Sequence, residues 1–379
     1  MSRISAIDSR PPVLGPSPSG TPEGCELLGL PPAAFIERVR DAGGGELHAR
    51  KLLRRLYRAN EAERRAGVET LAAGIPGLPN RLLARLRDWR AETPRVARRQ
   101  VSAADPGTVK LLLESADGAT FETVLFRNRR AAGRWSLCVS TQAGCRMACP
   151  FCATGRAGLK RNLTAAEIAG QLLVAREEVP AGERIANVVA MGMGEPLDNL
   201  PATLDAIEVL NSSDCLGVAA DRIVISTCGH VPGLERLARH PVPVGLAVSL
   251  HASTDALRDR LVPLNRRYPL ARLLATLKRH PLKTGKWICF EYILLKGVND
   301  SDRDAAALGP LLEGLRALVQ IIPYNPIEGA GFEPPTAAGA REFAARVRDS
   351  GVPVALRRSR GPDIDAACGQ LRAADSAPD

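Results

Sequence analysis

Three cysteines with a short, regular spacing stand out in the chain. Residues 145–152 read CRMACPFC, which places Cys145, Cys149 and Cys152 in a C-x3-C-x2-C pattern. Thiolates this close in sequence can bind a soft metal centre. A [4Fe–4S] cube usually takes four cysteines, so three of them leave one iron open to another ligand. Structural zinc, which would need a fourth Cys or His ligand, and chance clustering of buried thiols are the alternatives. We predict a [4Fe–4S] cluster with one open iron.

Small and polar residues follow several of the predicted strands. In MGMGEP, at 191–196, Gly194 would let a ligand approach the backbone, and the Glu195 carboxylate could pair with an amino group. A GxGE string alone usually indicates only a turn. Its position directly after a predicted strand is what favours a binding site here. The other candidates are Ser226, Ser249, Leu250, His251 and Asn325. Each could be an ordinary strand-end cap, but together they predict a ring of hydrogen-bonding groups.

Two further cysteines lie outside the cluster motif. Cys138 precedes Cys145 by seven residues, and Cys368 lies near the C-terminus in DIDAACGQL. Neither spacing suits a cluster ligand, so from the residues alone each is expected to be a buried, inert thiol. The remaining cysteines are predicted to be structural: Cys25, Cys215, Cys228 and Cys289.

Alternating strand and helix signals begin near residue 135. Strands are predicted at 135–141, 185–192, 221–227, 244–250, 287–295 and 318–324, with helices at 164–178, 200–211, 232–240, 269–280 and 302–315 between them. A last helix at 336–350 precedes a final strand at 353–358. Such alternation predicts an α/β fold with a parallel sheet, and the short connections favour a partial (β/α)6 TIM-like barrel. Chemistry in such barrels lies at the C-terminal ends of the strands, where these motifs fall.

Upstream of the barrel, the chain is helical and basic. Helices are predicted at 31–43, 46–60 and 80–90, and residues 31–100 contain 16 Lys/Arg against 8 Asp/Glu, which accounts for +8 of the net charge of +10. A charge run is often only a solvated helix face. Concentration of one sign in a small segment also favours RNA binding, because neutralising phosphates releases counterions. Residues 98–126 change to a strand period, and DPG and ADG supply turns of a β-meander.

These patterns divide the chain of 379 residues into five parts. We expect a disordered leader (1–24), a helical RNA-binding domain (25–97), a β-meander connector (98–130), a barrel with a C-terminal cysteine segment (131–372) and a disordered tail (373–379). The composition, 45% apolar and 24% charged, excludes a collagen-like or wholly disordered chain. No apolar run suits a membrane span or a signal peptide, so we expect a cytoplasmic protein that does not contact membranes.

The C-x3-C-x2-C spacing resembles the radical S-adenosylmethionine (SAM) superfamily. There the open iron chelates the amino and carboxylate groups of SAM, and one electron cleaves the sulfonium to a deoxyadenosyl radical. This resemblance implies that SAM contacts Gly194, Glu195, Ser226, Ser249, Leu250, His251 and Asn325. A longer series resembles the RlmN/Cfr family of radical methyltransferases over residues 30–372: CVSTQAGC, CPFCATG, RNLTAAEI, MGMGEPLDN, SLHA, LVPLNRRYP, YILLKGVNDS, IPYNP and RGPDIDAACGQL.

The family modifies one adenosine of bacterial 23S ribosomal RNA, adenosine 2503, and uses two SAM molecules per turnover. The resemblance implies that Cys368 first receives a methyl group from SAM and that its methylene radical then adds to the adenine. Cys138 would release the product by forming a transient disulfide with Cys368, and Glu122 in FETVLF matches the proton acceptor. We also expect an electron donor such as flavodoxin, and a monomer.

Two branches of the family differ in the carbon that they methylate. GEPLDN at 194–199 and RSRGPDIDAAC near the end resemble the C2-methylating branch, which we favour, whereas Gly158-Leu159-Lys160 resembles the C8-methylating branch. Activity on adenosine 37 of transfer RNAs is a further open alternative. Two alternatives from other classes also stay open. The chain could be a radical enzyme that acts on a protein or small molecule, which would not need the basic segment. It could also be a non-catalytic, metal-stabilised RNA-binding module, which would not need an open iron.

Overall fold

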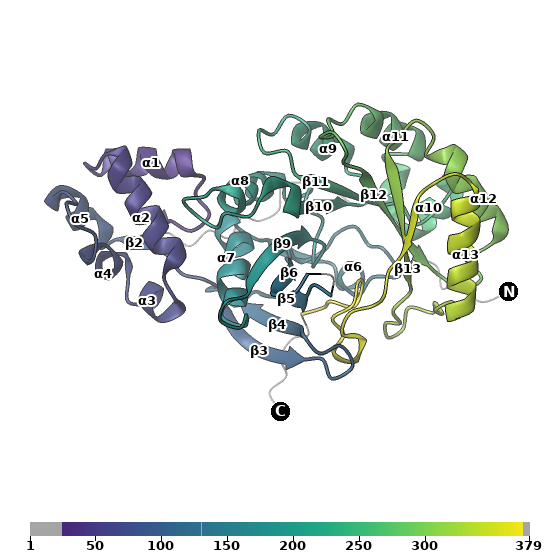
Figure 1. The fold of residues 1–379 in the computed structure, drawn as a ribbon, viewed down its shortest axis with the longest axis horizontal. Helices are drawn as coiled ribbons and strands as arrows, with labels where there is room; N and C mark the ends of the chain where they lie inside the picture. The colour runs from purple at the N-terminus through teal and green to yellow at the C-terminus, as the bar shows by residue number, and fades with distance from the viewer. Residues whose placement is uncertain (1–24, 130, 374–379) are drawn as a thin grey trace.

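A ten-stranded sheet dominates the computed structural model, which describes residues 25–129 and 131–373. The predicted leader (1–24) and residues 374–379 of the predicted tail lie outside the described residues. Seven strands are parallel and neighbour one another in chain order: β6 (Arg134–Cys138), β9 (Arg184–Ala190), β10 (Ile223–Thr227), β11 (Gly245–Ser249), β12 (Ile288–Leu294), β13 (Ala317–Pro323) and β14 (Val354–Leu356). The sheet ends at β14 on one side, so the barrel is partial and open, as predicted (Figure 1).

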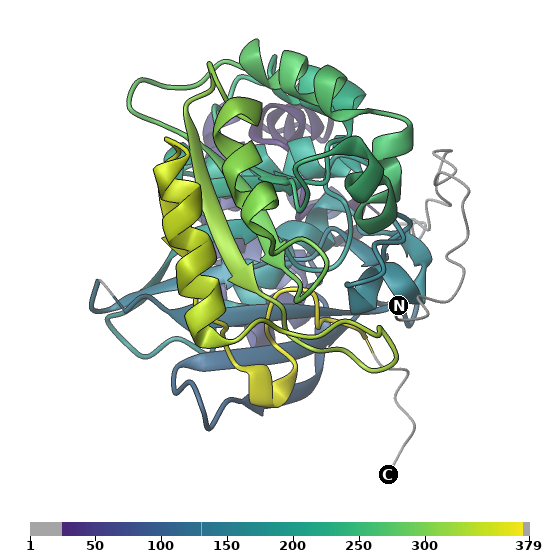
Figure 2. The ribbon, with the colours of Figure 1, turned by 90° about the vertical axis from the view of Figure 1, so that its right-hand side faces the viewer.

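Apolar runs explain why these strands pair in the interior. Parallel strands covered on both faces favour continuous Val, Ile and Leu, and strands such as VGLAVSL supply them. The connecting helices are α7 (Ala165–Arg176), α8 (Leu200–Asn211), α9 (Val231–Leu237), α10 (Asp255–Leu261), α11 (Leu270–Lys278), α12 (Asp302–Leu311) and α13 (Ala337–Asp349), with short 3-10 turns at Ala220–Arg222, Pro263–Arg266 and Pro362–Ile364. The last two helices, α12 and α13, pack against each other beside β13 and β14 (Figure 2).

Three antiparallel strands extend the same sheet. They are β3 (Arg95–Val101), β4 (Thr108–Glu114) and β5 (Thr120–Arg127), and β5 pairs antiparallel with β6. The meander was predicted, and its turns fall at the expected DPG and ADG sequences. Its continuity with the barrel was not foreseen. Register places Val124 of β5 opposite Cys138 of β6, so the meander forms a wall beside this thiol.

The basic N-terminal segment forms short helices with their own apolar core. These are α1 (Pro32–Asp41), α2 (Glu46–Arg58), α3 (Glu61–Arg65), α4 (Val68–Ala73) and α5 (Asn80–Leu86), with a parallel pair of two-residue strands, β1 (Cys25–Glu26) and β2 (Trp89–Arg90). This core continues into α7 and α8 through Ala169 and Val209. The nearly buried Asp214 carboxylate binds Arg50 at 2.5 Å and Arg54 at 2.7 Å. The helical segment is therefore fixed to the outside of the barrel (Figure 1).

One hairpin and one short helix were absent from the sequence prediction. The strands β7 (Gln142–Gly144) and β8 (Leu159–Asn162) form an antiparallel pair, and α6 (Ala153–Ala157) lies between them. Both elements are too short to produce a clear hydrophobic period. Across the part of the chain that the structure describes, no helix combines the length and apolar character needed to traverse a lipid bilayer.

Candidate active site

The three motif cysteines lie on the loop that the β7–β8 hairpin holds. Gly144, at φ +82°, makes the close turn, because a Cβ there would lie 2.0 Å from the Gly158 carbonyl oxygen. The Cys145 N–H donates to that same oxygen at 2.8 Å, and the Cys152 N–H donates to the Cys149 carbonyl at 3.1 Å. The hairpin and these hydrogen bonds keep the three thiols on one side of the loop, where they line a single cavity.

The cysteine loop lies in an apolar environment. Met147, Phe151 and Tyr324 belong to the cluster of apolar side chains around it. Burial raises the pKa of all three thiols, and for Cys145 and Cys149 a neighbouring thiol raises it further. Without a compensating cation these groups would stay protonated. A bound metal centre supplies the positive charge that makes thiolate ligands favourable.

The cavity in front of these thiols has a volume of about 150 Å³. It is lined by the cysteines, by residues at or just after the C-terminal ends of β9 to β11, and by one residue within β12: Gly194, Glu195, Ser226, Ser249, His251 and Glu291. Among residues 25–129 and 131–373, no three His, Cys, Asp or Glu side chains converge on one point as a single zinc ion would require. Each cysteine of an iron–sulfur cube binds a different iron, so the cube needs no such convergence. The thiols and the cavity therefore fit a cube.

Gly194 and Glu195 form one wall of this cavity. Gly194 has φ +104°, and a Cβ there would lie 2.7 Å from the Gln142 Cβ and 2.8 Å from its backbone nitrogen. The Glu195 carboxylate is 3% exposed and accepts hydrogen bonds from the Cys228 N–H at 2.8 Å and the Leu197 N–H at 3.1 Å. Burial raises its pKa. These bonds hold a carboxylate at the cavity, where it can pair with an amino group.

His251 is fixed as a hydrogen-bond donor. Its Nδ1 accepts the Ile293 N–H at 3.1 Å, so the neutral ring carries its proton on Nε2. Burial, aided by the nearby Arg258, lowers its pKa to about 3. The ring meets Phe151 edge-on, with centroids 4.9 Å apart. This neutral donor belongs to the same cavity as Ser226 and Ser249.

Two predicted cofactor residues lie elsewhere. Leu250 is completely buried in the barrel core, between the cavity-lining Ser249 and His251. Asn325 lines a neighbouring cavity, and its side-chain amide donates to the Cys368 carbonyl at 3.2 Å. Leu250 packs in the core and Asn325 supports the C-terminal segment, and the contact of each with SAM stays a prediction.

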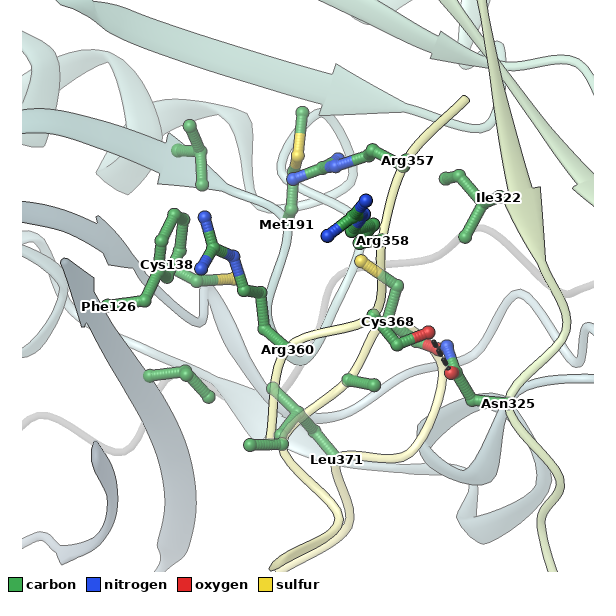
Figure 3. A pocket seen from close by; sticks show the side chains of 15 residues that line it. Phe126, Cys138, Met191, Ile322, Asn325, Arg357, Arg358, Arg360, Cys368 and Leu371 are labelled. Atoms are coloured by element: carbon green, nitrogen blue, oxygen red, sulfur yellow. Dashed lines mark hydrogen bonds between the residues drawn. The ribbon is translucent and has the colours of Figure 1, made fainter. Parts of the chain in front are cut away.

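The neighbouring cavity, of about 40 Å³, contains the other two predicted thiols. Cys138, at the end of β6, and Cys368 approach it from opposite sides, and Cys368 also lines the larger cavity (Figure 3). Cys138 and Cys368 are both free thiols. Burial raises the pKa of Cys138 to about 12, with a further contribution from Cys368. Burial also raises the pKa of Cys368, while Arg357 opposes this effect.

The segment that carries Cys368 is attached to the cysteine loop. The Ala153 N–H, which follows Cys152 directly, donates to the Gly369 carbonyl at 2.8 Å. The Gln370 amide donates to the Pro326 carbonyl at 3.1 Å. Cys368 therefore keeps a fixed position between the two cavities.

Glu122, the predicted proton acceptor, lies under the C-terminal segment. It is 4% exposed, and Lys110 Nζ lies 3.1 Å from one carboxylate oxygen and donates to the Asp365 carbonyl at 3.3 Å. Burial raises its pKa, whereas Lys110 lowers it. Among the described residues that line the two cavities, Glu122 does not occur. Its role as a base stays a prediction.

Glu291 and Arg357 were missed by the sequence analysis. Glu291 lines the larger cavity, accepts a hydrogen bond from Ser226 at 3.3 Å, and pairs with Arg357, which lines the smaller one, at 3.3 Å. The pair therefore connects the two cavities. The only signal for Glu291 in the sequence was that it is the single acidic residue within the apolar strand ICFEYILL.

Comparisons with known proteins agree with this arrangement. Residues 139–308 match the model of the radical SAM superfamily. The probable dual-specificity RNA methyltransferase RlmN of Moorella thermoacetica is 45% identical over 92% of this chain and 97% of its own length. Its namesake from Thermosynechococcus vestitus is 46% identical over 76% of this chain and 85% of its own.

A solved structure is also similar over nearly the whole chain. The crystal structure of a radical SAM methyltransferase from Sphaerobacter thermophilus superposes with a TM-score of 0.82 at 41% identity, covering 92% of this chain and 100% of that one. With the three-cysteine cavity and the near full-length relatives, this likeness identifies the chain as a member of the RlmN family of radical SAM RNA methyltransferases.

Proposed function

We propose that this enzyme methylates C2 of adenosine 2503 in 23S ribosomal RNA through an S-methylcysteine at Cys368. The observation that carries the proposal is the position of Cys368, which lines both the three-cysteine cavity and the cavity that contains Cys138. A thiol that receives a methyl group from SAM and later passes it to RNA must face both. The family resemblance supports the same assignment.

The two cavities would have different roles in the reaction. The cluster, when bound by Cys145, Cys149 and Cys152, supplies the electron for reductive cleavage of SAM, with flavodoxin as the proposed donor. Glu195 and the Nε2–H of His251 would orient SAM in the larger cavity. The Cys368 thiolate takes the methyl group from SAM and carries it toward the smaller cavity.

Cys138 then completes the reaction. After the S-methyl group has lost a hydrogen atom, its carbon has bonded to C2 of the adenine, and the adduct has lost one electron and the C2 proton, the Cys138 thiolate attacks the sulfur of Cys368. That attack forms an S–S bond and breaks the bond between sulfur and the methylene carbon, which takes up a proton to become the new methyl group, and the methylated base is released. Both thiols line the same cavity, which supports this step.

The basic helical segment would bind the RNA. Arg58, Arg81 and Arg85 are exposed on its surface, and fixation to α7 and α8 holds them in one orientation relative to the cavities. The relatives are named probable dual-specificity RNA methyltransferases RlmN, which favours the RlmN branch. Methylation at C2, and transfer RNA as a second substrate, are part of our proposal.

Mass spectrometry of 23S rRNA from a strain lacking the gene tests the proposal. We expect 2-methyladenosine to be lost and to be restored by the wild-type protein but not by Cys368→Ala. Cys289→Ala, which removes a half-buried thiol of β12 outside both cavities, is the matched control and should restore it. Persistence of the modification in the knockout would overturn the substrate assignment, and 8-methyladenosine would transfer the enzyme to the C8 branch.

A further inference from the structure

Three arginines of one short segment line the cavity shared by Cys138 and Cys368. Residues 357–360 read Arg-Arg-Ser-Arg and follow β14 directly. All three line this cavity, and in Figure 3 Arg358 is drawn beside Cys368 and Arg360 beside Cys138. Positive charge is therefore concentrated where the proposed mechanism requires the RNA base.

Two of these arginines are held by carboxylates. Arg357 lies 3.3 Å from Glu291, and its backbone N–H donates to the Ile321 carbonyl at 2.8 Å. Arg360 lies 3.3 Å from Asp105 and over the ring of Phe126, 5.4 Å from its centroid. Both side chains already have partners that fix them as parts of the cavity wall.

Arg358 differs from its neighbours. Its side chain is exposed, and no residue in the described ranges forms a hydrogen bond or an ion pair with it. Arg357 pairs with Glu291, and Arg360 shares Asp105 with Arg129. Arg358 therefore has no carboxylate partner among the described residues, unlike the other two arginines that line the cavity.

The unpaired guanidinium group of Arg358 suits a phosphodiester. A guanidinium group binds two phosphate oxygens at once, and such charge-assisted hydrogen bonds are stronger than neutral ones. The carboxylate of SAM is the less suitable partner, because the described residues that line the larger cavity include none of the three arginines.

We propose that Arg358 binds a backbone phosphate next to the target nucleotide and so positions the base between Cys138 and Cys368. This inference rests on the proposed function, because it takes the smaller cavity as the place where the base is modified. Arg358 is a positioning residue, since it would bind the substrate backbone and not the reacting atoms.

Binding and turnover of an rRNA fragment by the reconstituted, full-length enzyme test the proposal. We expect Arg358→Gln to raise KM for the RNA about tenfold, with a smaller change in kcat, and to flatten the dependence of log Kd on log salt concentration by about one unit, the contribution of one phosphate contact. Arg358→Lys should recover the salt slope but only part of the affinity, because an ammonium group cannot bind two oxygens in a fork.

Arg341→Gln is the matched control. It removes one positive charge from the exposed surface of α13, away from both cavities, and should leave KM and the salt slope unchanged. Methylation of Cys368 by SAM in the absence of RNA, followed by mass spectrometry, should proceed at the wild-type rate in Arg358→Gln.

A wild-type salt slope in Arg358→Gln would overturn the proposal, as would slower methylation of Cys368 without any effect on RNA binding. Failure of the proposed function would look different. In that case the wild-type protein would produce no 2-methyladenosine, whereas the salt slopes, which are measured by binding alone, would still report the phosphate contact.

Discussion

Replacing Gly194 by alanine tests whether the turn before Glu195 builds the SAM site. Gly194 has φ +104°, a conformation that costs a residue with a Cβ about 1–2 kcal/mol. The new Cβ would also lie 2.7 Å from the Gln142 Cβ and 2.8 Å from its backbone nitrogen. Overpacking of this kind costs about 1–3 kcal/mol. The total expected cost is about 2–5 kcal/mol.

This cost cannot be relieved without moving Glu195. The Gln142 side chain donates to Asn162 and Asp198, both at 2.8 Å, and accepts the Glu195 N–H at 2.9 Å. If the Gly194 turn moves away from Gln142, the hydrogen bond between the Glu195 N–H and the Gln142 side chain is lost, and Glu195 is displaced. If most of this free energy is lost from SAM binding, the affinity for SAM should fall by roughly 30-fold or more, since ~1.4 kcal/mol corresponds to a factor of ten.

Equilibrium binding of SAM to the anaerobically reconstituted protein measures this loss. Gly182→Ala is the matched control, because Gly182 also has positive φ, +84°, but nothing lies within 4 Å of its added Cβ. That variant should lose about 1–2 kcal/mol of stability and bind SAM normally. Wild-type SAM affinity in Gly194→Ala would refute the reasoning, because the turn would then tolerate a side chain without displacing the carboxylate.

Two further predictions concern a thiol and a buried acid. Cys138→Ala should accumulate a covalent enzyme–RNA adduct on denaturing gels, because the thiol that resolves it is absent; free RNA with normal turnover would remove Cys138 from the mechanism. Burial, with Glu167 and Glu92 nearby, raises the pKa of Glu26 to about 7 from 4.5, so its contribution to stability is complete below pH 4.5 and lost as the pH rises through 7. Glu26→Gln should remove up to about 3 kcal/mol of this pH dependence in denaturant unfolding measured between pH 5 and 8, and an unchanged pH dependence would contradict the assignment.

Much of the barrel could be predicted because its strands are long, apolar and separated by helices. The runs at 244–250 and 287–295 correspond to β11 and β12, since a strand covered on both faces requires such residues. The β7–β8 hairpin was missed because segments of three and four residues show no period. Its shape depends on Gly144 and on backbone hydrogen bonds of the cysteine loop.

The sequence could predict which residues follow the strands and lie near the candidate site, but not which cavity each of them lines. Ser249, the last residue of β11, and His251, which has φ +60°, line the cavity, while Leu250 between them packs in the core. The hydrogen bond from Asn325 to the Cys368 carbonyl could not be predicted, because nothing in the sequence around Asn325 shows that the C-terminal segment returns beside it.

Attachment of Cys368 to α6 links the two halves of the site. The N-terminal residue of α6, Ala153, follows Cys152, and its N–H binds the Gly369 carbonyl at 2.8 Å. A change in the cysteine loop is therefore transmitted through one hydrogen bond to the residue next to Cys368. From the opposite side, Asn325 and the Arg357–Glu291 pair hold the same segment against β12 and β13. The segment of Cys368 is hydrogen-bonded to the cysteine loop on one side and held against these strands on the other. The position of Cys368 between the two cavities therefore does not depend on the flexibility of a free tail.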